Sequence, residues 1–534
     1  MHIGRQALLH PPFSSLTMSW FEDNRLLLLL LPISFVSIGL LRRLLTNRSL
    51  PPGPPGLPLI GNVLSLDPAE PWKTYAKWGA KYGDIFYYRI FSQEVVVINS
   101  EEIAKDLLER RSSNYSDRPF FPVRIPFGWA NHFGWMPYGS EWRLARRFFL
   151  QSFHAEAALS FRPMQLRKTH TLLQSLLATP ESYFDHLAIF AGSIIMAANY
   201  DYDMKSTDDP MFPIIERGLV GLQYLTPETT LVLDAFPFLL RLPGWFPGTD
   251  LKRKAALSSE YASRMIETPL SYALEKINTG TAAPCLTSDL MNRKKSDGVT
   301  PEADYDLAVK QASWSAFVGG AETTSSALLN FILAMVLFPN VQKRARAEIE
   351  AVVGVDRLPT FGDQPALPYI EAVVRECLRW APVLPLGVAH AAINSDVYEG
   401  YHIPRGATVI ANLWAMAYDE AVYPNPAEFR PERFLDVHGQ LISAEGPSYP
   451  FGFGRRTCPG RSTGEASIWA GVASLVAVFE FSKAKDAHGD DVDFEPSYTS
   501  GVTRHPNPFP CCIRPRSGVD AGVLERLIAN SAMV

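Results

Sequence analysis

The chain is poor in cysteine and has no two cysteines at a metal-binding or redox spacing. The odd number of cysteines and the lack of a CxxC pattern argue against a disulfide framework and against a zinc site. Reduced, cytosol-facing surroundings fit this cysteine usage best. The adjacent pair near the C-terminus is expected to be two packed thiols, not a redox couple. The five cysteines are Cys285, Cys377, Cys458, Cys511 and Cys512.

The chain also lacks internal repeats, low-complexity segments and a strong charge of either sign. A formal net charge of −5 gives no reason to expect a nucleic-acid partner. The length would allow three or four ordinary domains, but no linker divides residues 50–515, which indicates one large domain. With 47% hydrophobic residues the chain is long and apolar enough to enclose a large cofactor within its core.

Leu26–Leu41 is a run of apolar and small residues without a charge. A membrane-spanning helix needs about 20 residues, so aromatic and arginine side chains must extend the run at both ends. We predict a transmembrane anchor over residues 26–45 after an N-terminal extension, residues 1–25. A cleaved signal peptide is the alternative, but no small-x-small cleavage site follows. The flanking side chains are Trp20, Phe21, Arg42 and Arg43.

Charges around this run predict its orientation. Three arginines (Arg42, Arg43 and Arg48) follow it, whereas Glu22 and Asp23 precede it, so the positive-inside rule places the body in the cytosol. The expected location is the endoplasmic reticulum membrane, with a single span, and the Asn-x-Ser sequons at Asn47 and Asn114 are then not glycosylated. Residues 1–17 look like an extension, with Met18 as a candidate start.

A proline-rich segment, residues 46–58, follows the predicted anchor and contains Pro51-Pro-Gly-Pro-Pro-Gly-Leu-Pro58. Such a sequence favours a stiff, polyproline-like hinge that would hold the body at a fixed angle to its anchor. An ordinary flexible linker is the alternative.

Hydrophobic patterns predict a mainly helical body with small β-sheets. A segment from about Leu307 to Phe338 is apolar nearly all round, so we expect a helix in the centre of the body that stops at Pro339. Further helices are predicted at Val341–Gly354 and Tyr369–Trp380. The body is expected to span residues 59–515, followed by a C-terminal tail, residues 516–534. The β-like segments are Ile85–Ile90, Val95–Ile98, Val397–Ile403 and Val409–Asn412.

The segment Phe451-Gly-Phe-Gly-Arg-Arg-Thr-Cys-Pro-Gly460 surrounds Cys458 with residues that suit a thiolate ligand of haem iron. Gly454 and the last glycine would let the backbone turn and bring N–H groups toward the sulfur. Arg456 would direct a cation at a haem propionate, and Phe451 would shield the proximal side of the iron. Thiolate ligation favours O–O cleavage. The alternative is a buried free cysteine in a glycine-rich turn.

A second pattern, Gly319-Gly-Ala-Glu-Thr-Thr-Ser325, lies within the predicted central helix. Two interior glycines cost about 1 kcal/mol each relative to alanine, so they need a reason. A locally widened helix would leave room for a diatomic ligand and water, and Glu322 and Thr323 would supply an acid and an alcohol for proton delivery. The alternative is a glycine seam for close helix packing, with Glu322 solvated.

The cysteine segment resembles the Phe-x-x-Gly-x-Arg-x-Cys-x-Gly signature of the cytochrome P450 superfamily at every constrained position. The glycine–acid–alcohol segment is similar to the oxygen-activation groove of the same superfamily. This resemblance covers about residues 45–515. It implies the cytochrome P450 fold, a single haem-enclosing domain behind a membrane anchor, with Cys458 as the axial ligand of the iron of haem b.

Two further motifs carry the same resemblance. Glu376-Cys-Leu-Arg379 places an acid and a base on one helical face and resembles the superfamily's Glu-x-x-Arg. Its usual partner is the arginine of Pro-Glu-Arg-Phe, here Arg433. The resemblance implies that Glu376, Arg379 and Arg433 form a buried network that holds the proximal side of the haem pocket. A buried network is costly unless complete, so loss of one member should prevent haem retention.

Trp142-Arg-Leu-Ala-Arg146 resembles the Trp-x-x-x-Arg of the superfamily's third helix, with Trp142 and Arg146 both facing the haem propionates. His390 occupies a position where related fungal enzymes carry a propionate contact; an ordinary core or surface histidine is the alternative. A basic patch would suit docking of an acidic flavoprotein donor, with scattered surface arginines as the alternative. The patch consists of Arg143, Arg147, Arg455 and Arg461.

Several segments resemble a fungal, basidiomycete microsomal branch similar to O-methylsterigmatocystin oxidoreductases. Three features depart from it: Tyr418 stands where histidine is common, Ala389 replaces a proline, and Phe120–Asn131 is unusual. That last segment belongs to the loop that roofs the substrate, so the substrate of relatives does not transfer. The similar segments are Asn114-Tyr-Ser-Asp-Arg118, Phe133-Gly-Trp-Met-Pro-Tyr-Gly139, Pro382-Val-Leu-Pro-Leu-Gly387 and Gly400-Tyr-His-Ile-Pro404.

The resemblance implies monooxygenation of an apolar small molecule, a secondary metabolite of terpenoid, polyketide or aromatic type. The expected partners are NADPH–cytochrome P450 reductase, cytochrome b5 as an optional second donor, the membrane and the substrate. A haem-thiolate isomerase or dehydratase, which usually lacks the acid–alcohol pair, and a non-catalytic haem sensor are the alternatives. Substrate contacts are expected from the Phe120–Phe133 loop, Phe317, Ala321, Val383–Leu386 (Val383 and Leu386 above all) and Ser500–Thr503.

Overall fold

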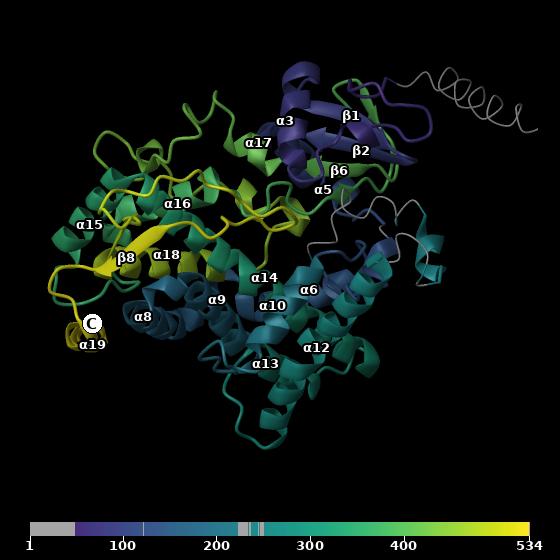
Figure 1. Ribbon diagram of the computed structural model, residues 1–534. Helices are drawn as coiled ribbons and strands as arrows, with labels where there is room; N and C mark the ends of the chain where they lie inside the picture. The colour runs from purple at the N-terminus through teal and green to yellow at the C-terminus, as the bar shows by residue number, and fades with distance from the viewer. Residues whose placement is uncertain are drawn as a thin grey trace, which may run out of the picture.

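The structure is a computed structural model that describes residues 49–532 except 121, 223–232, 234–235, 244 and 246–249. A strand-rich part gathers at one end, where the purple and green segments β1, β2, β6, α3 and α17 lie together (Figure 1). Helices fill the rest, and the C-terminal helix α19 lies at the opposite end. The description agrees with the predicted fold class, mainly helical with small sheets.

The main sheet joins the beginning of the body to its later part. Its strands lie in the order β1-β2-β6-β3, with β1 antiparallel to β2 and β2 parallel to β6. Val96 of β2 and Val409 of β6 are opposite each other and fully buried, so the sheet brings distant segments together through apolar contacts. The strands are β1 (Ile85–Ile90), β2 (Gln93–Ile98), β3 (His390–Ala391) and β6 (Thr408–Ala411).

The predicted β segment Val397–Ile403 is two strands, which corrects the prediction of one. Strands β4 (Asp396–Tyr398) and β5 (Tyr401–Ile403) pair as an antiparallel hairpin. The turn residues Glu399 and Gly400 both have positive φ, at 50° and 80°. Two successive positive φ values are typical of the tight turns whose twist matches a hairpin. A second hairpin joins β7 (Phe479–Lys483) to β8 (Cys511–Pro515).

The predicted central helix is α14 (Glu302–Leu337), which begins five residues earlier than expected. It packs against α9 (Tyr183–Tyr200), α6 (Ser140–Phe153) and α18 (Arg461–Val478). Pro339 follows the end of α14 and is the first residue of α15 (Pro339–Val352). At this position its missing N–H costs nothing, because the first N–H groups of a helix have no partner within the helix.

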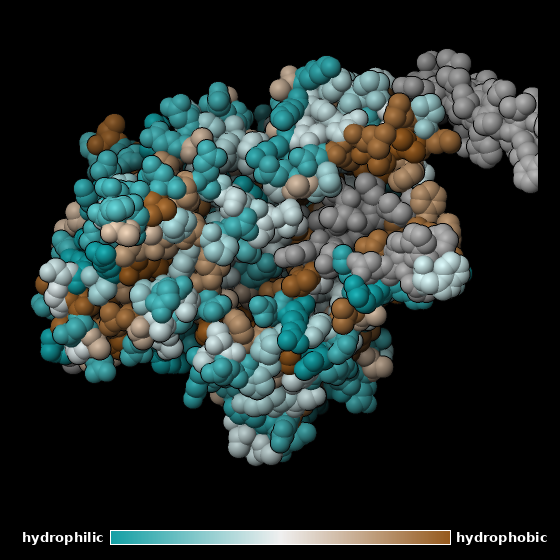
Figure 2. Space-filling model, viewed as in Figure 1, coloured by the Kyte–Doolittle hydropathy of each residue, from teal (hydrophilic) through white to brown (hydrophobic). Residues whose placement is uncertain are grey.

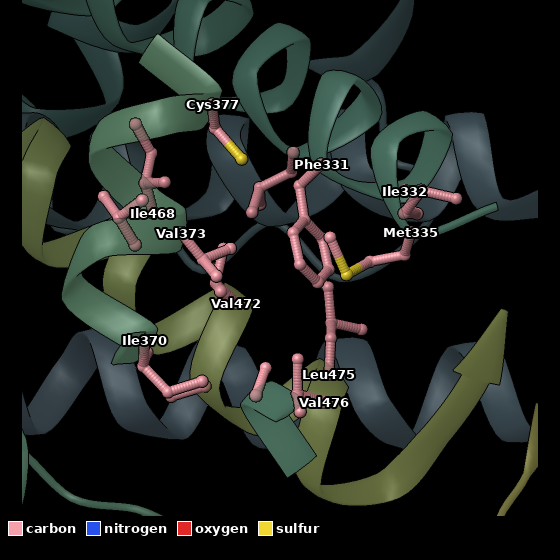
Figure 3. Packing of buried hydrophobic residues seen from close by; sticks show 14 of the residues in the cluster. Phe331, Ile332, Met335, Ile370, Val373, Cys377, Ile468, Val472, Leu475 and Val476 are labelled. Atoms are coloured by element: carbon pink, nitrogen blue, oxygen red, sulfur yellow. The ribbon is translucent and has the colours of Figure 1, made fainter. Parts of the chain in front are cut away.

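Helices α14, α16 (Pro368–Trp380) and α18 meet in the largest apolar cluster of the described residues. Figure 3 shows Phe331 and Met335 of α14 facing Val373 of α16 and Leu475 of α18. These side chains are almost completely buried. Burial of each contributes roughly 1.5–3 kcal/mol, so the cluster fixes the three helices relative to one another.

The described residues form further helices around these elements. They are α3 (Pro71–Tyr82), α4 (Glu101–Ala104), α5 (Ser112–Tyr115), α7 (Ala155–Ala158), α8 (Arg162–Ala178), α10 (Phe212–Leu222), α12 (Asp250–Asn278), α13 (Leu286–Lys294), α17 (Leu413–Ala417) and α19 (Ala521–Ser531), with a π-helical turn at Lys105–Arg110.

The two ends of the body are attached to it. At the front, the Pro52 carbonyl accepts the Tyr87 N–H (2.9 Å) and the Ser49 carbonyl accepts the His402 N–H (2.7 Å), so the described part of the proline-rich segment lies along the sheet. At the back, the predicted tail contains α19, whose Leu524 and Leu527 are buried in the main cluster.

The predicted anchor over residues 26–45 and the extension before it lie outside the described residues. Within the described part of the chain, only α14 is long and apolar enough to cross a membrane. Most of that helix is buried inside the body, which is the behaviour of a core helix.

Candidate active site

One cavity, enclosing about 330 Å³, collects most of the predicted site residues. It lies between α14, the loop at residues 132–135, the cysteine segment and a C-terminal loop at residues 502–503. Apolar side chains from α6, α9 and α14 form much of its wall. The predicted residues that line it are Trp142, Arg146, Glu322, Thr323, Val383, His390, Phe451, Arg456 and Cys458.

Cys458 lies in the turn before α18, with its backbone N–H donated to the Phe451 carbonyl (2.7 Å). Its accessible surface opens into the cavity, so a ligand can reach a thiol that protein surrounds on its other sides. Burial raises the pKa of the thiol, while the Gly460 N–H and the charge of Arg146 act in the opposite direction. A metal ion bound to the sulfur would displace the thiol proton, and the Gly460 N–H would stabilise the thiolate.

The sequence predicts that Gly454 brings an N–H toward the Cys458 sulfur, but the structure gives this glycine another role. It has φ 55°, and a Cβ at this position would overlap the Leu108 carbonyl oxygen. The residue is therefore glycine because the cysteine segment passes directly over the end of another helix. The N–H that reaches the sulfur belongs to Gly460.

Three arginines and a histidine form a buried basic wall around one end of the cavity. Arg456 donates to the carbonyls of Ser116 (2.7 Å) and Met136 (2.8 Å), and its guanidinium lies 4.1 Å from the centre of the Trp142 ring. Burial lowers the pKa of Arg456 to about 9. Arg146 donates to the Thr457 carbonyl (2.6 Å).

Arg118 belongs to this wall, although the sequence assigned it no role. Its guanidinium donates to the carbonyls of Gly134 (2.8 Å) and Val388 (2.6 Å). Burial and the charges of Arg456 and Arg146 hold its pKa well below the usual range. The only signal for Arg118 in the sequence is its place at the end of Asn114-Tyr-Ser-Asp-Arg118, a segment that resembles the fungal branch.

His390 completes the wall as a neutral imidazole. Its Nδ1–H donates to the Tyr115 carbonyl (2.7 Å), and burial, followed by the charge of Arg118, holds its pKa well below the usual range.

This wall fits the carboxylates of a haem group. Buried guanidinium groups are costly without an anion, and carbonyl oxygens satisfy their N–H groups but not their charge. In addition, the indole N–H of Trp142 is buried without a hydrogen-bond partner. Arg118, Arg146, Arg456, Trp142 and His390 would therefore hold the propionates, and Cys458 would ligate the iron.

The two glycines of α14 have different roles. A Cβ on Gly320 would lie 2.8 Å from Cγ1 of Ile195 in α9, so this glycine permits close helix packing. A Cβ on Gly319 would meet nothing within 4 Å, and Gly319 lines the cavity. Gly320 lines the cavity too, but only Gly319 has open space where a Cβ would stand, so the functional interpretation applies to Gly319 and the packing interpretation to Gly320.

The predicted local widening of this helix is wrong, because α14 is continuous α-helix through the motif. The Thr323 hydroxyl donates to the Gly319 carbonyl (2.6 Å), which keeps the backbone closed and the hydroxyl oxygen at the cavity.

The packing alternative requires a solvated Glu322, but the structure does not leave this side chain in bulk solvent. It lines the cavity beside Thr323 and Thr503. Burial raises the pKa of the Glu322 carboxyl, and the nearby Thr503 and His505 offset part of this rise. A carboxyl with a raised pKa stays protonated to a higher pH than an exposed glutamate, which suits a proton donor.

Three of the predicted substrate contacts lie outside the lining of this cavity. Phe317 packs edge-on against Tyr200, and Ala321 is buried in an apolar cluster. Leu386 packs on the cluster under the main sheet. None of the three lines the cavity, whereas their neighbours Ala316, Val318 and Leu384 do.

Of the predicted roofing loop, only its end reaches the cavity among the residues that the structure describes. Phe133 and His132 line it, and the Phe133 N–H donates to the Ser315 hydroxyl (3.0 Å). Phe120, at the other end of the loop, is exposed. Burial lowers the pKa of His132 to about 3, so its ring is neutral.

Glu376, Arg379 and Arg433 form the predicted network. Both Nε and Nη2 of Arg379 lie 2.7 Å from the Glu376 carboxylate oxygens, and Arg433 Nε lies 3.1 Å from Oε1. The Glu376 and Arg379 side chains have no exposed surface. Remaining donors reach backbone, with Arg379 Nη1 on the Ala417 carbonyl (3.0 Å), so the network is complete.

The chain matches the cytochrome P450 family model over residues 51–513. It is 38% identical over 509 residues to the cytochrome P450 monooxygenase claR of Ampulloclitocybe clavipes, covering 94% of this chain and 93% of that protein. It is 38% identical over 475 residues to the cytochrome P450 monooxygenase ple1 of Rhodocybe pseudopiperita, covering 88% and 90%.

A third relative is the cytochrome P450 monooxygenase COX1 of Coprinopsis cinerea, 34% identical over 503 residues, covering 92% of this chain and 96% of that protein. All three relatives are basidiomycete proteins matched over nearly their whole length. Together with the cysteine segment and the basic wall, these matches show that the chain belongs to the cytochrome P450 family and is a cytochrome P450 monooxygenase.

Proposed function

We propose that this protein holds haem b in the cavity, with Cys458 as axial ligand, and inserts one atom of O2 into an apolar secondary metabolite of terpenoid, polyketide or aromatic type. The observation that carries the proposal is a single cavity that joins the Cys458 thiol, a buried basic wall and a mostly apolar lining. An apolar lining with few polar groups suits an apolar small molecule.

Haem would supply oxygen binding and activation, and the residues of the chain prepare its surroundings. Apolar side chains from α6 and α9, such as Phe149 and Ile194, exclude bulk water from the cavity. The Gly319 position leaves space beside α14. The Thr323 hydroxyl, fixed to the Gly319 carbonyl, can receive or donate a proton at the cavity edge, and the Glu322 carboxyl can store one.

An isomerase or dehydratase that needs no external electrons is the other candidate. The buried Glu322 carboxyl beside the Thr323 hydroxyl favours the monooxygenase, because isomerisation or dehydration would not use this acid–alcohol pair. Addition of reductase distinguishes the two candidates. A monooxygenase consumes NADPH when the reductase is present, whereas an isomerase or dehydratase needs no external electrons.

Thr323→Ala should uncouple electron transfer from product formation. The hydroxyl would be lost while alanine, a strong helix former, preserves α14. We expect haem content and substrate binding to be unchanged and the peroxide formed per NADPH oxidised to rise. General acid–base participation is worth roughly 10²–10⁴-fold, and Glu322 would limit the loss to the lower end or less. Unchanged coupling and an unchanged product rate would remove Thr323 from proton delivery.

We further propose that the electron donor is NADPH–cytochrome P450 reductase, docking at the face that bears Arg143, Arg147 and Arg455, with cytochrome b5 as an optional second donor. All three arginines are exposed, and Arg455 belongs to the cysteine segment itself. Cations on this face would attract an acidic flavoprotein and speed its docking.

The double variant Arg143→Gln, Arg147→Gln should slow reduction by the reductase at low ionic strength. The difference from the wild type should shrink as salt is raised, because exposed charges are screened over about 10 Å at 0.1 M. Stopped-flow reduction at two salt concentrations measures it. Equal rates for both proteins at low salt would show that these arginines do not attract the donor.

Membrane attachment is proposed through a span at residues 26–45 in the endoplasmic reticulum, with the body in the cytosol. The described surface supports a body that touches the bilayer: apolar surface lies near β1 and β2 in Figure 2. Leu57, Leu59 and Leu64 are exposed there, in the segment that pairs with the end of β1. Such apolar patches mark membrane or protein contacts.

Deletion of residues 1–48 should weaken membrane association and leave the haem spectrum intact, because the cavity residues all follow this segment. Fractionation of the full-length and truncated proteins measures it, and some residual binding through the exposed leucines is expected. Release of the full-length protein by alkaline extraction would contradict a spanning helix.

A further inference from the structure

The first turn of α18 follows the cysteine segment directly and divides its residues between two faces. Gly460 and Gly464, four residues apart, both line the cavity. Arg461 and Glu465 each stand one position later, so they share the neighbouring face of the helix. Arg461 Nε donates to Glu465 Oε1 (3.0 Å). Small residues therefore face the cavity, and an ion pair lies along the face beside them.

The Arg461 side chain extends from α18 to the start of the cysteine segment. Its guanidinium lies 5.2 Å from the centre of the Phe451 ring, within the range of a cation–π contact. Only 25% of the Arg461 side chain and 38% of the Glu465 side chain are exposed. The sequence places Arg461 in a docking patch, and the other three arginines of that patch are exposed. Arg461 differs from them because its charge is engaged within the protein.

Phe451 is fixed beside the thiol through its backbone. Its carbonyl accepts the Cys458 N–H (2.7 Å), and its own N–H donates to the Ser448 carbonyl (3.0 Å). Phe451 and Cys458 both line the cavity. The backbone bonds do not restrict the side-chain torsions of Phe451, which set the direction of the ring. The contact with Arg461 does restrict them.

We propose that Arg461, held by Glu465, is a positioning residue for Phe451: it keeps the aromatic ring at the cavity wall next to Cys458 and so keeps water from the thiolate. The inference rests on the proposed ligation of haem iron by Cys458. The thiolate form of cysteine is the one that binds metal, and water that reaches the sulfur can hydrogen-bond to it and supply a proton. A ring that stays in place prevents this.

An effect of charge alone predicts a different result. Burial raises the pKa of the Cys458 thiol, the charge of Glu465 adds to this rise, and the charge of Arg461 opposes it. Through charge alone, loss of Arg461 would weaken thiolate ligation and loss of Glu465 would strengthen it. If Glu465 instead holds Arg461 against the ring, its loss should weaken ligation as well. The two explanations differ in sign for Glu465.

The experiment measures how fast thiolate ligation is lost. Purified holoprotein is reduced, bound to carbon monoxide and warmed mildly at one fixed pH, and the decay of the thiolate-specific absorption band is followed. This needs neither substrate nor reductase. Arg461→Met and Glu465→Met should each lose the band roughly three- to tenfold faster than the wild type, as removal of a partly exposed cation–π contact and ion pair predicts. Arg461→Lys keeps a cation and should stay close to the wild-type rate.

A double-mutant cycle shows whether Arg461 acts through Phe451. In a Phe451→Leu background, Arg461→Met should cause no further acceleration, because the ring that it positions is absent. Arg264→Met is the matched control. The Arg264 guanidinium lies 5.8 Å from the centre of the Tyr261 ring, and neither residue lines the cavity. This variant should lose the band at the wild-type rate.

A wild-type rate in Arg461→Met, a slower rate in Glu465→Met, or an equal acceleration by Arg461→Met with and without the Phe451 ring would overturn the inference. If the wild type shows no thiolate band at all, the proposed ligation by Cys458 fails instead. The midpoints of thermal unfolding of the four proteins in the cycle then test the contact itself: an equal effect of Arg461→Met in both backgrounds would show that Arg461 does not hold Phe451.

Discussion

Replacing Cys458 with serine should abolish the absorption band that marks thiolate-ligated, carbon monoxide-bound ferrous haem. The structure places this thiol at the cavity wall, beside the Gly460 N–H and the charge of Arg146, both of which stabilise a thiolate. A serine hydroxyl cannot replace it, because its proton is far harder to remove and oxygen gives less electron density to iron. We expect the whole band to be lost, even where haem is retained by the basic wall.

Cys512→Ser is the matched control. Cys512 lies in β8, outside the cavity, and the change removes one thiol in the same way. Its carbon monoxide spectrum should equal that of the wild type. Reduced protein with carbon monoxide, measured by difference absorption for both variants, decides the matter: a thiolate band that survives in Cys458→Ser would show that another residue ligates the iron.

Short motifs were sufficient to predict the parts of the site that one segment builds. A local sequence pattern is enough to predict each of three features, and the structure contains all three. They are the cysteine turn, the Glu376–Arg379 pair and the long apolar helix. Arg118 could not be assigned a role in this way. The Val388 carbonyl that its guanidinium bonds and the neighbouring Arg456 are far away in the sequence, and only the tertiary fold brings these groups together.

The misplaced substrate contacts have a different cause. Phe317 and Ala321 were placed at the cavity because the phase of α14 is hard to read: the helix is apolar nearly all round, and no polar face shows which side meets the cavity. Its two glycines were equally ambiguous, since either could serve packing. The β segment at Val397–Ile403 was read as one strand because Glu399-Gly400 is a weaker turn signal than Asn-Gly.

Arg379→Met should prevent stable haem retention. Glu376 would keep its charge in a site without exposed surface, and Arg433, at 3.1 Å, would be its only remaining side-chain partner among the described residues. Removing one partner of a buried pair costs about 3–5 kcal/mol, because the remaining charge is left uncompensated. This is a large part of the 5–15 kcal/mol that holds typical domains folded.

The loss should reach the active site through helix packing. Arg379 belongs to α16, which packs against α18, and α18 begins directly after the cysteine turn. A displaced α16 therefore displaces the end of α18 that faces Cys458. Haem content per protein and the midpoint of thermal unfolding measure the effect, and we expect both to fall steeply in Arg379→Met.

Lys310→Met is the control for removing a cation from an ion pair. Lys310 Nζ lies 2.9 Å from Glu267 Oε1, but both side chains are about half exposed, at 42% and 58%. Exposed pairs of this kind contribute roughly 0–1 kcal/mol, so haem content should stay at the wild-type level. If Arg379→Met and Lys310→Met retain haem equally well, the buried network does not support the haem site. If only Arg379→Met loses haem, haem retention depends on the buried network being complete.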